Sequence, residues 1–412
     1  MEKRNALTIF EHDILRVGDT LDARAFRSLA RFHDKICDSY FDLGFDCVKF
    51  KQYVGIIRVD DLTIEVLPKI DRDGYGRGTE LWRTALLEML AASGFLRADI
   101  LSNALQSVGK TPLLDIIALQ FLAAEEILAR EGLLRKYRRE AGNVSALKGK
   151  LLFTQHVNRN LTKPDKWFTD HSVYDRNHAL NGILRLALDI LYAVCSSELK
   201  ARLFAVRLDF LDIPPFHPDS AFMDRLSYDR RTERYREAID IAWLIVRNLG
   251  PAIRYGDSPV FALMFDMNNL FERTVLHLLT VEARRRNDGT VVLRPESRRF
   301  WNRMYLRPDI LIQRENERII IDTKWKLPAT GGPDEHDLRQ VFTYGLYFSA
   351  GKVILLYPGT DTDRGLSGKF EPVPAFPNSE VRCEKRYSKL VTTTGRLDKD
   401  FAHDFFSELF PI

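Results

Sequence analysis

Two aspartates and one lysine lie around a β-hairpin that the sequence predicts. Its strands are the apolar segments at residues 305–312 and 319–326, joined by a short polar turn. Antiparallel pairing about this turn puts Asp309 directly opposite Asp322, where like charges roughly 4.5–5.5 Å apart at Cβ destabilise the hairpin. A bound cation would turn this repulsion into attraction. Because Lys324 follows two residues after Asp322, it shares the same face of the strand. The cluster predicts a metal-dependent phosphodiester hydrolase.

Each residue of this cluster also has a plain structural explanation. Asp309 could be an ordinary carboxylate at a strand end. Asp322 could form an ion pair with Lys324 or Lys326, since an unpaired charge in an apolar strand is costly. The alignment of all three groups favours the metal site. Oxygen ligands suit Mg²⁺, for which Mn²⁺ could substitute, and the main-chain carbonyl of Thr323 would join them. Lys324 would orient or deprotonate the attacking water.

The helix predicted at residues 267–286 offers a further acidic ligand. At the helical period, Glu272 falls on the edge of the apolar stripe, neither fully inward nor fully outward. A surface glutamate is the ordinary interpretation. A carboxylate on this rim could instead reach a cleft at the sheet edge and bind the same metal ion. Asp266 and Glu282 are weaker alternatives.

Two further pairs of residues could contact nucleic acid. Residues 334–348 predict another helix, on which Gln340 and Tyr344 share one face. They could pack at the flank of the core, or hold the nucleic-acid backbone or the attacking water. Arg303 and Arg307 lie in an arginine-rich segment just before the hairpin, where they could serve solubility or contact phosphates.

The composition is that of a globular protein rather than a disordered one, with 45% hydrophobic and 29% charged residues. A net charge of +4 over 412 residues neither demands nor excludes nucleic acid. The four cysteines have no zinc-ligand spacing, which indicates reduced thiols. The N-terminus lacks the apolar core of a signal peptide, and no stretch is long enough to cross a bilayer. We therefore expect a cytoplasmic protein without membrane contact.

The length predicts an α+β protein of several domains. We expect a small β-rich domain at residues 1–79, a helical middle region at 80–250, and an α/β domain with a mixed central sheet at 251–412. The middle region contains a basic stretch at 134–166, which could be a solvated face or a track for a phosphate backbone. A glycine-rich segment at 71–78 indicates an exposed contact loop.

The candidate residues together resemble the PD-(D/E)xK nuclease superfamily. They include a helical Glu272, the pair Pro308-Asp309 and the element Asp322-Thr-Lys324, while Gln340 and Tyr344 resemble a motif of its RecB-like branch. A closer resemblance, over nearly the whole chain, is to the McrC family, the nuclease subunits of McrBC modification-dependent restriction systems. The segments that carry it are 53–69, 147–151, 175–181, 268–272, 307–311 and 321–326.

This resemblance implies that residues 251–412 form a restriction-endonuclease-like domain in which Asp309, Asp322, Lys324 and Glu272 are catalytic. It also implies a partner, an oligomeric McrB-like AAA+ GTPase that recognises modified DNA and translocates. The N-terminal β domain would dock onto that partner. The nuclease subunit would stimulate the GTPase and cut double-stranded DNA, and two subunits could pair to cut both strands.

Two alternatives stay open at this point. A stand-alone RecB-like repair nuclease would carry the same motif without a GTPase partner. A catalytically inactive DNA-binding adaptor would keep only the fold, and the intact Asp309, Asp322 and Lys324 argue against it. The modified base that is targeted would be chosen by the partner, so it does not follow from this chain.

Overall fold

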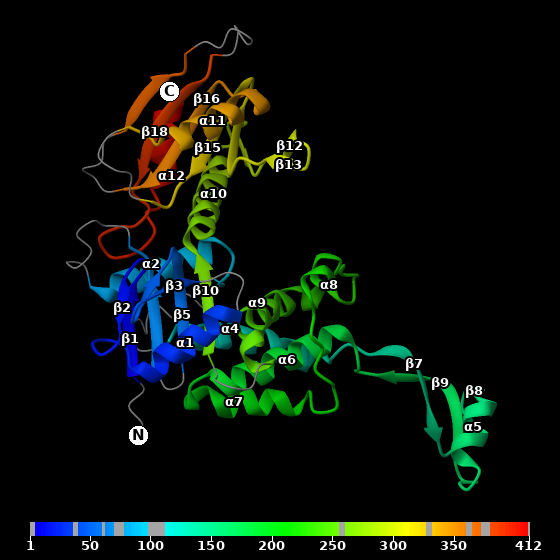
Figure 1. Ribbon diagram of the computed structural model, residues 1–412. Helices are drawn as coiled ribbons and strands as arrows, with labels where there is room; N and C mark the ends of the chain where they lie inside the picture. Colours follow the sequence, from blue (N-terminus) through cyan, green and yellow to red (C-terminus); the bar gives the residue numbers. More distant parts are fainter. Residues whose placement is uncertain are drawn as a thin grey trace. The chain divides into compact units, whose positions relative to one another are not determined.

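A computed structural model of the protein describes residues 5–35, 40–59, 62–69, 78–97, 112–254, 260–326, 332–359, 365–371 and 380–410. The chain divides into two units (Figure 1). Unit 1 combines residues 1–113 with 256–412, and unit 2 comprises 114–255. The expected boundary near residue 250 lies close to the end of unit 2. The expected separate domain at residues 1–79 is instead part of unit 1.

The N-terminal strands belong to unit 1 because they share a sheet with a strand from the C-terminal half of the chain. The order is β1-β6-β5-β10, with β1 and β6 parallel and the other pairs antiparallel. The strands are β1 (Asn5–Phe10), β5 (Tyr53–Val59), β6 (Leu62–Leu67) and β10 (Val260–Asp266). Gly55 faces Met264 at φ 137°, and a Cβ there would overlap the carbonyl oxygen of Leu263. Glycine thus permits β5 and β10 to approach.

A smaller antiparallel sheet and one helix complete the N-terminal core. The sheet has the order β2-β4-β3. The elements are β2 (Ile14–Arg16), α1 (Ala23–Lys35), β3 (Phe41–Gly44) and β4 (Cys47–Phe50). Leu29 of α1 lies in one buried cluster with Phe41, Phe50 and Ile57. Period-two alternation of apolar side chains turns one face of each strand toward this core.

A mixed six-stranded sheet forms the second part of unit 1, as the sequence predicts. Its order is β11-β14-β15-β16-β18-β17, in which β15, β16 and β18 are parallel and the other pairs are antiparallel. The strands are β11 (Val291–Leu293), β14 (Ile310–Arg314), β15 (Glu317–Thr323), β16 (Lys352–Pro358), β17 (Leu366–Lys369) and β18 (Arg382–Ser388). Strand β16 is almost wholly buried, as expected for a parallel strand covered on both faces.

Four helices and one hairpin accompany the two main sheets of unit 1. They are α2 (Thr79–Ala92), α10 (Met267–Arg286), the hairpin β12 (Arg298–Trp301) and β13 (Met304–Leu306), α11 (Glu335–Phe348) and α12 (Phe401–Leu409). Helix α11 packs Val341, Tyr344 and Phe348 into a cluster with Val353 and Leu355 of β16. Helix α10 follows directly on β10 and contacts both α2 and α12, so it links the N-terminal sheet to the mixed sheet.

Unit 2 consists of packed helices and an arm (Figure 1). The helices are α4 (Leu113–Glu131), α6 (Ala179–Val194), α7 (Ser197–Leu208), α8 (Ser220–Asp224), η1 (Glu233–Tyr235) and α9 (Arg236–Arg254). The arm, residues 136–175, contains the antiparallel strands β7 (Lys136–Val144), β8 (Lys150–Leu151) and β9 (Trp167–Asp175), with α5 (Phe153–Asn160). The helical interpretation of residues 80–250 missed these strands. No residue of β7 is buried, so the sequence carries no apolar alternation there.

The two helices that the sequence predicts near the site are present. The helix at residues 267–286 agrees end to end, and the one at 334–348 begins one residue later than predicted. The contact loop expected at 71–78 lies, apart from Gly78, outside the described residues. Within the described ranges, no helix is both long and apolar enough to cross a membrane.

Candidate active site

The β14–β15 hairpin has the predicted register. Its turn contains Glu315 at φ 52°, and Ile312 pairs with Ile319. The ladder ends one residue after Asp309, which therefore precedes β14 instead of pairing with Asp322 along the ladder. The predicted juxtaposition is thus made by side chains at the end of the hairpin rather than by strand pairing.

Asp309 is fixed by hydrogen bonds from the end of β15. Its Oδ2 atom accepts from the main-chain N and from Oγ1 of Thr323, each at 2.7 Å. Asp322, the residue before Thr323, is 3% exposed. Burial, followed by the neighbouring Asp309 carboxylate, raises the pKa of Asp322 well above its usual range. The two carboxylates therefore lie close enough to repel each other, as the sequence predicts.

Lys324 lies against Asp322. Its Nζ atom is 2.7 Å from Asp322 Oδ2, which accepts no hydrogen bond of normal geometry, so the contact is an ion pair. The main-chain N of Lys324 donates to the carbonyl of Leu356 at 2.9 Å, which holds the loop against β16. Burial works against the charge of Lys324, but Asp322 raises the pKa of this ammonium above its ordinary value. Lys324 is therefore held as a cation.

Helix α11 supplies a polar group that positions the lysine. Gln340 Oε1 accepts a hydrogen bond from Lys324 Nζ at 2.8 Å. Gln340 Nε2 donates to the hydroxyl of Tyr344 at 3.0 Å, which confirms that Gln340 and Tyr344 share one helix face. Tyr344 is buried in the cluster beneath α11. Contact of either residue with nucleic acid stays a prediction.

Asp337, which sequence reasoning missed, is a buried acidic neighbour of the site. Its Oδ2 atom lies 2.6 Å from Lys326 Nζ and accepts from the Tyr357 hydroxyl at 3.0 Å, and its Oδ1 atom is 3.8 Å from Lys324 Nζ. Burial opposes the charge, but Lys326 lowers the pKa of Asp337 below its ordinary value. The available signal was its spacing, because it precedes Gln340 by three residues on α11.

Glu272 lies near Asp309 but is paired with an arginine. Its carboxylate makes an ion pair with Arg294. Burial, followed by the charge of Asp309, raises the pKa of Glu272. Arg307 is exposed and near enough to Glu272 to favour its charge. Arg303 is exposed in the turn between β12 and β13. A role for Glu272 as a metal ligand stays a prediction.

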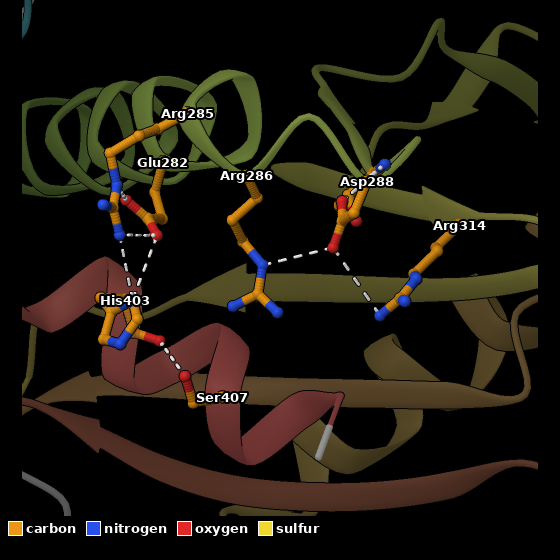
Figure 2. A network of polar contacts seen from close by, with 8 residues as sticks. Glu282, Arg285, Arg286, Asp288, Arg314, His403 and Ser407 are labelled. Carbon is orange, nitrogen blue, oxygen red and sulfur yellow. Dashed lines mark hydrogen bonds and ion pairs between the residues drawn. The ribbon is translucent and has the colours of Figure 1, made fainter. Parts of the chain in front are cut away.

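The two weaker acidic alternatives have structural partners elsewhere. Asp266 caps α10, accepting from the main-chain N of Asn268 at 2.8 Å. Glu282 forms a bidentate pair with Arg285 at the other end of α10 and also contacts His403 of α12 (Figure 2). The hydrogen bond from Arg285 lowers the pKa of Glu282. Both residues therefore stabilise α10.

The residues of the site fit Mg²⁺ by the chemistry of their donors. Among the described residues, no three acidic, histidine or cysteine side chains are gathered closely enough to hold a metal ion by themselves. Mg²⁺ does not need three, since it is usually held by one or two carboxylates together with waters and substrate phosphates. Asp309 and Asp322 supply two repelling carboxylates, and the buried Oδ2 atom of Asp322 forms an ion pair with Lys324 without a hydrogen bond of normal geometry.

A buried glutamate ties the loop after Lys324 to the N-terminal sheet. Glu11 Oε1 accepts hydrogen bonds from the main-chain N of Lys69 and from Nε1 of Trp325, both at 2.8 Å. The ring of Trp325 lies 5.3 Å from that of Phe271, the residue before the candidate ligand on α10. Sequence reasoning missed this contact because its partners lie 314 residues apart and share no motif.

The chain is similar to known proteins over far more than the residues of the site. The family model described as McrBC 5-methylcytosine restriction system component matches residues 48–358. A chain in the refined half-complex from a tetradecameric assembly of Thermococcus gammatolerans McrB AAA+ hexamers with bound McrC is 18% identical, with a TM-score of 0.65 over 98% of this chain and 100% of that chain. A chain in the cryo-EM structure of the Thermococcus gammatolerans McrBC complex is 21% identical, with a TM-score of 0.48 over 67% and 87%. No curated protein matches the chain.

We predict that Glu11→Gln removes a pH-dependent loss of stability. Burial raises the pKa of Glu11 from 4.5 to about 7. The folded chain therefore binds this proton more tightly than the unfolded chain. The stability that protonation of Glu11 contributes is complete below the unfolded pKa of 4.5 and is lost as pH rises through the folded pKa of about 7. The difference is on the order of 3 kcal/mol. Urea unfolding at about pH 5 and pH 8 should show the variant gaining this much over wild type at the higher pH.

The amide oxygen of glutamine can still accept from Lys69 and Trp325, so the contact itself is kept in this variant. If the unfolding free energies of wild type and Glu11→Gln changed equally with pH, Glu11 would not be the source of the pH dependence.

Proposed function

The chain belongs to the McrBC 5-methylcytosine restriction system component family, and we propose that it is the subunit that hydrolyses phosphodiester bonds of double-stranded DNA. The observation that carries the proposal is the ion pair of Asp322 with Lys324 beside the Asp309 carboxylate, at the end of an apolar hairpin. A buried carboxylate beside a second, half-buried carboxylate and an ammonium is costly to maintain without a function for the group. A mixed sheet flanked by helices suits the PD-(D/E)xK nuclease fold that we propose for residues 260–410.

Asp309, Asp322, Glu272 and the main-chain carbonyl of Thr323 would hold Mg²⁺. When bound, this ion polarises the phosphate and lowers the pKa of a coordinated water. The repulsion between the two aspartates favours any cation that lies between them. Glu272 would contribute only if its ion pair with Arg294 opened.

Lys324 has the chemistry to orient the attacking water and to stabilise charge on the phosphate. Its pKa is raised by Asp322, so it acts as a cation rather than as a general base in the state described. Gln340 and Asp337 limit its movement, since both approach Nζ. Arg303 and Arg307, both exposed, would contact flanking phosphates.

We further propose an AAA+ GTPase as the partner. A chain of the same fold occurs in an assembly of McrB AAA+ hexamers with bound McrC. The arm of unit 2 suits a protein contact because its far end exposes Leu147, Phe153 and Leu161. Exposed apolar side chains that lie together mark interaction surfaces. A stand-alone repair nuclease would have no use for such a surface.

We predict that Asp309→Ala, Asp322→Ala and Lys324→Ala each lower DNA cleavage by a factor on the order of 10³ or more, since each removes charge that stabilises the transition state. Asp322→Asn keeps the shape and should be equally inactive. Cleavage of a modified DNA duplex is measured together with melting temperature.

Glu317→Ala is the matched control, because Glu317 is an exposed acid on the same strand. It should cleave at the wild-type rate. Full cleavage by folded Asp322→Asn would refute the assignment of the site.

We also predict that cleavage requires Mg²⁺ or Mn²⁺ and that Ca²⁺ does not replace them. Ca²⁺ takes more ligands at longer distances, so it would bind the same oxygens without the geometry that the reaction needs. The measurement is cleavage after EDTA treatment and after adding back each ion. Activity that survives EDTA would rule out the metal mechanism.

The proposed contact of the arm with the partner is best tested on the full chain. A fragment of residues 1–250 would lack β10 and α10, which belong to unit 1. We expect the double variant Phe153→Asp/Leu161→Asp to lower stimulation of the partner's GTP hydrolysis tenfold or more, as loss of buried apolar contacts costs about 2 kcal/mol at a binding hot spot. Leu366→Asp, also an exposed apolar position, is the control and should stimulate normally. Normal stimulation by the arm variant would show that docking occurs elsewhere.

A further inference from the structure

The hairpin β12–β13, which ends three residues before Asp309, exposes apolar side chains. Trp301 is 69% exposed, Met304 57% and Tyr305 61%. The strand register is irregular between Arg299 and Trp301. As a result, Trp301 pairs with Met304 across the turn. Single exposed apolar residues are ordinary on a soluble protein, but a group of this kind on one small element marks a contact surface.

The base of this hairpin packs against the C-terminal end of helix α11. Arg298 donates a hydrogen bond to the carbonyl of Tyr347, and its guanidinium lies 4.7 Å from the centre of the Phe348 ring. The ring of Phe300 meets that of Tyr347 edge-on at 5.5 Å. A two-stranded hairpin alone is marginally stable, so these contacts hold its base in place while the turn residues stay exposed.

The charge of the hairpin complements a phosphate backbone. Residues 297–308 contain four arginines and no acidic residue. Two copies of such a segment would repel each other, which disfavours a self-contact at this surface. Among the arginines, Arg303 is exposed in the turn beside Trp301, where it could bind a phosphate.

The hairpin is also within reach of a duplex that occupies the site. Asn302 in the turn precedes Asp309 by seven residues, so their separation is at most about 25 Å even if the chain is fully extended. One turn of B-DNA spans about 34 Å. A duplex with a phosphate at Asp309 therefore places the turn residues within one helical turn of the cleaved bond.

We propose that the β12–β13 hairpin is a DNA-distorting wedge, in which Trp301 and Met304 insert between base pairs while Arg303 contacts an adjacent phosphate. Apolar side chains that enter a base step unstack it and kink the duplex, and pyrimidine–purine steps yield most easily. The inference rests on the proposed function for the position of the duplex. It adds a contact with bases to a site otherwise described by phosphate contacts.

The test uses the full chain in EDTA, so that binding is observed without cleavage. Short duplexes carry one 2-aminopurine at a pyrimidine–purine step, whose fluorescence rises when the base unstacks. Anisotropy of a labelled duplex measures affinity. Wild type should raise the fluorescence, whereas Trp301→Ala/Met304→Ala should not, and should bind about tenfold more weakly, as expected for loss of a base-stacking contact.

Two further variants separate stacking from charge. Trp301→Phe should retain the fluorescence change. Arg303→Ala should keep the fluorescence change while weakening affinity and reducing the salt dependence of binding by about one counterion. Leu366→Ala, another exposed apolar position in unit 1, should match wild type.

A wild-type chain that does not raise the fluorescence, or a double variant that raises it as much as wild type does, overturns the wedge. A shift of the double variant to a smaller oligomer in sedimentation, with unchanged DNA affinity, would assign the hairpin to a contact between copies instead. A chain that unstacks DNA but never cleaves it on addition of Mg²⁺ would keep the wedge and refute only the nuclease.

Discussion

Two like charges, one of them buried, lie close together at the end of an apolar hairpin, and the residues around them must compensate this repulsion. Asp322 is nearly inaccessible and lies beside Asp309, so its charge needs compensation that water does not supply. Lys324 provides part of it, and Gln340 and Asp337 hold that lysine from a different element. The order β14-β15-β16 with α11 packed against it therefore positions the charge cluster. Asp322 lies on β15 and Asp337 on α11, while the Leu356 carbonyl of β16 holds the backbone of Lys324.

The N-terminal sheet is directly connected to the candidate site by hydrogen bonds. Trp325, next to Lys324, donates to Glu11, and Glu11 also accepts from Lys69 at the end of the β6 segment. The pairing of β10 with β5 joins the same two parts through the main chain. Only the Glu11 side chain and the residue Trp325 therefore separate the N-terminal strands from Lys324.

How much of this could be predicted from the sequence depends on whether the signal is local. The register of the hairpin followed from alternation of apolar residues, and the shared face of Gln340 and Tyr344 followed from helical spacing. The pairing of Glu11 with Trp325 leaves no local pattern, because a buried polar contact between distant segments has no period. The arm strands were missed for a related reason, since no face of β7 is buried. The pairing of β10 with β5, some two hundred residues earlier, also leaves no local pattern in the sequence.

Charge distinguishes the two exposed apolar surfaces, which otherwise look alike. The basic stretch of the arm is partly neutralised in the structure, where Arg138 pairs with Asp175 and Arg139 with Asp170. Long-range attraction to phosphate falls when each cation has its own acid nearby. The β12–β13 hairpin has no acidic residue between 297 and 308. An apolar surface with balanced charge suits a protein, and one with only arginines suits DNA, so the hairpin rather than the arm is the element expected at the duplex.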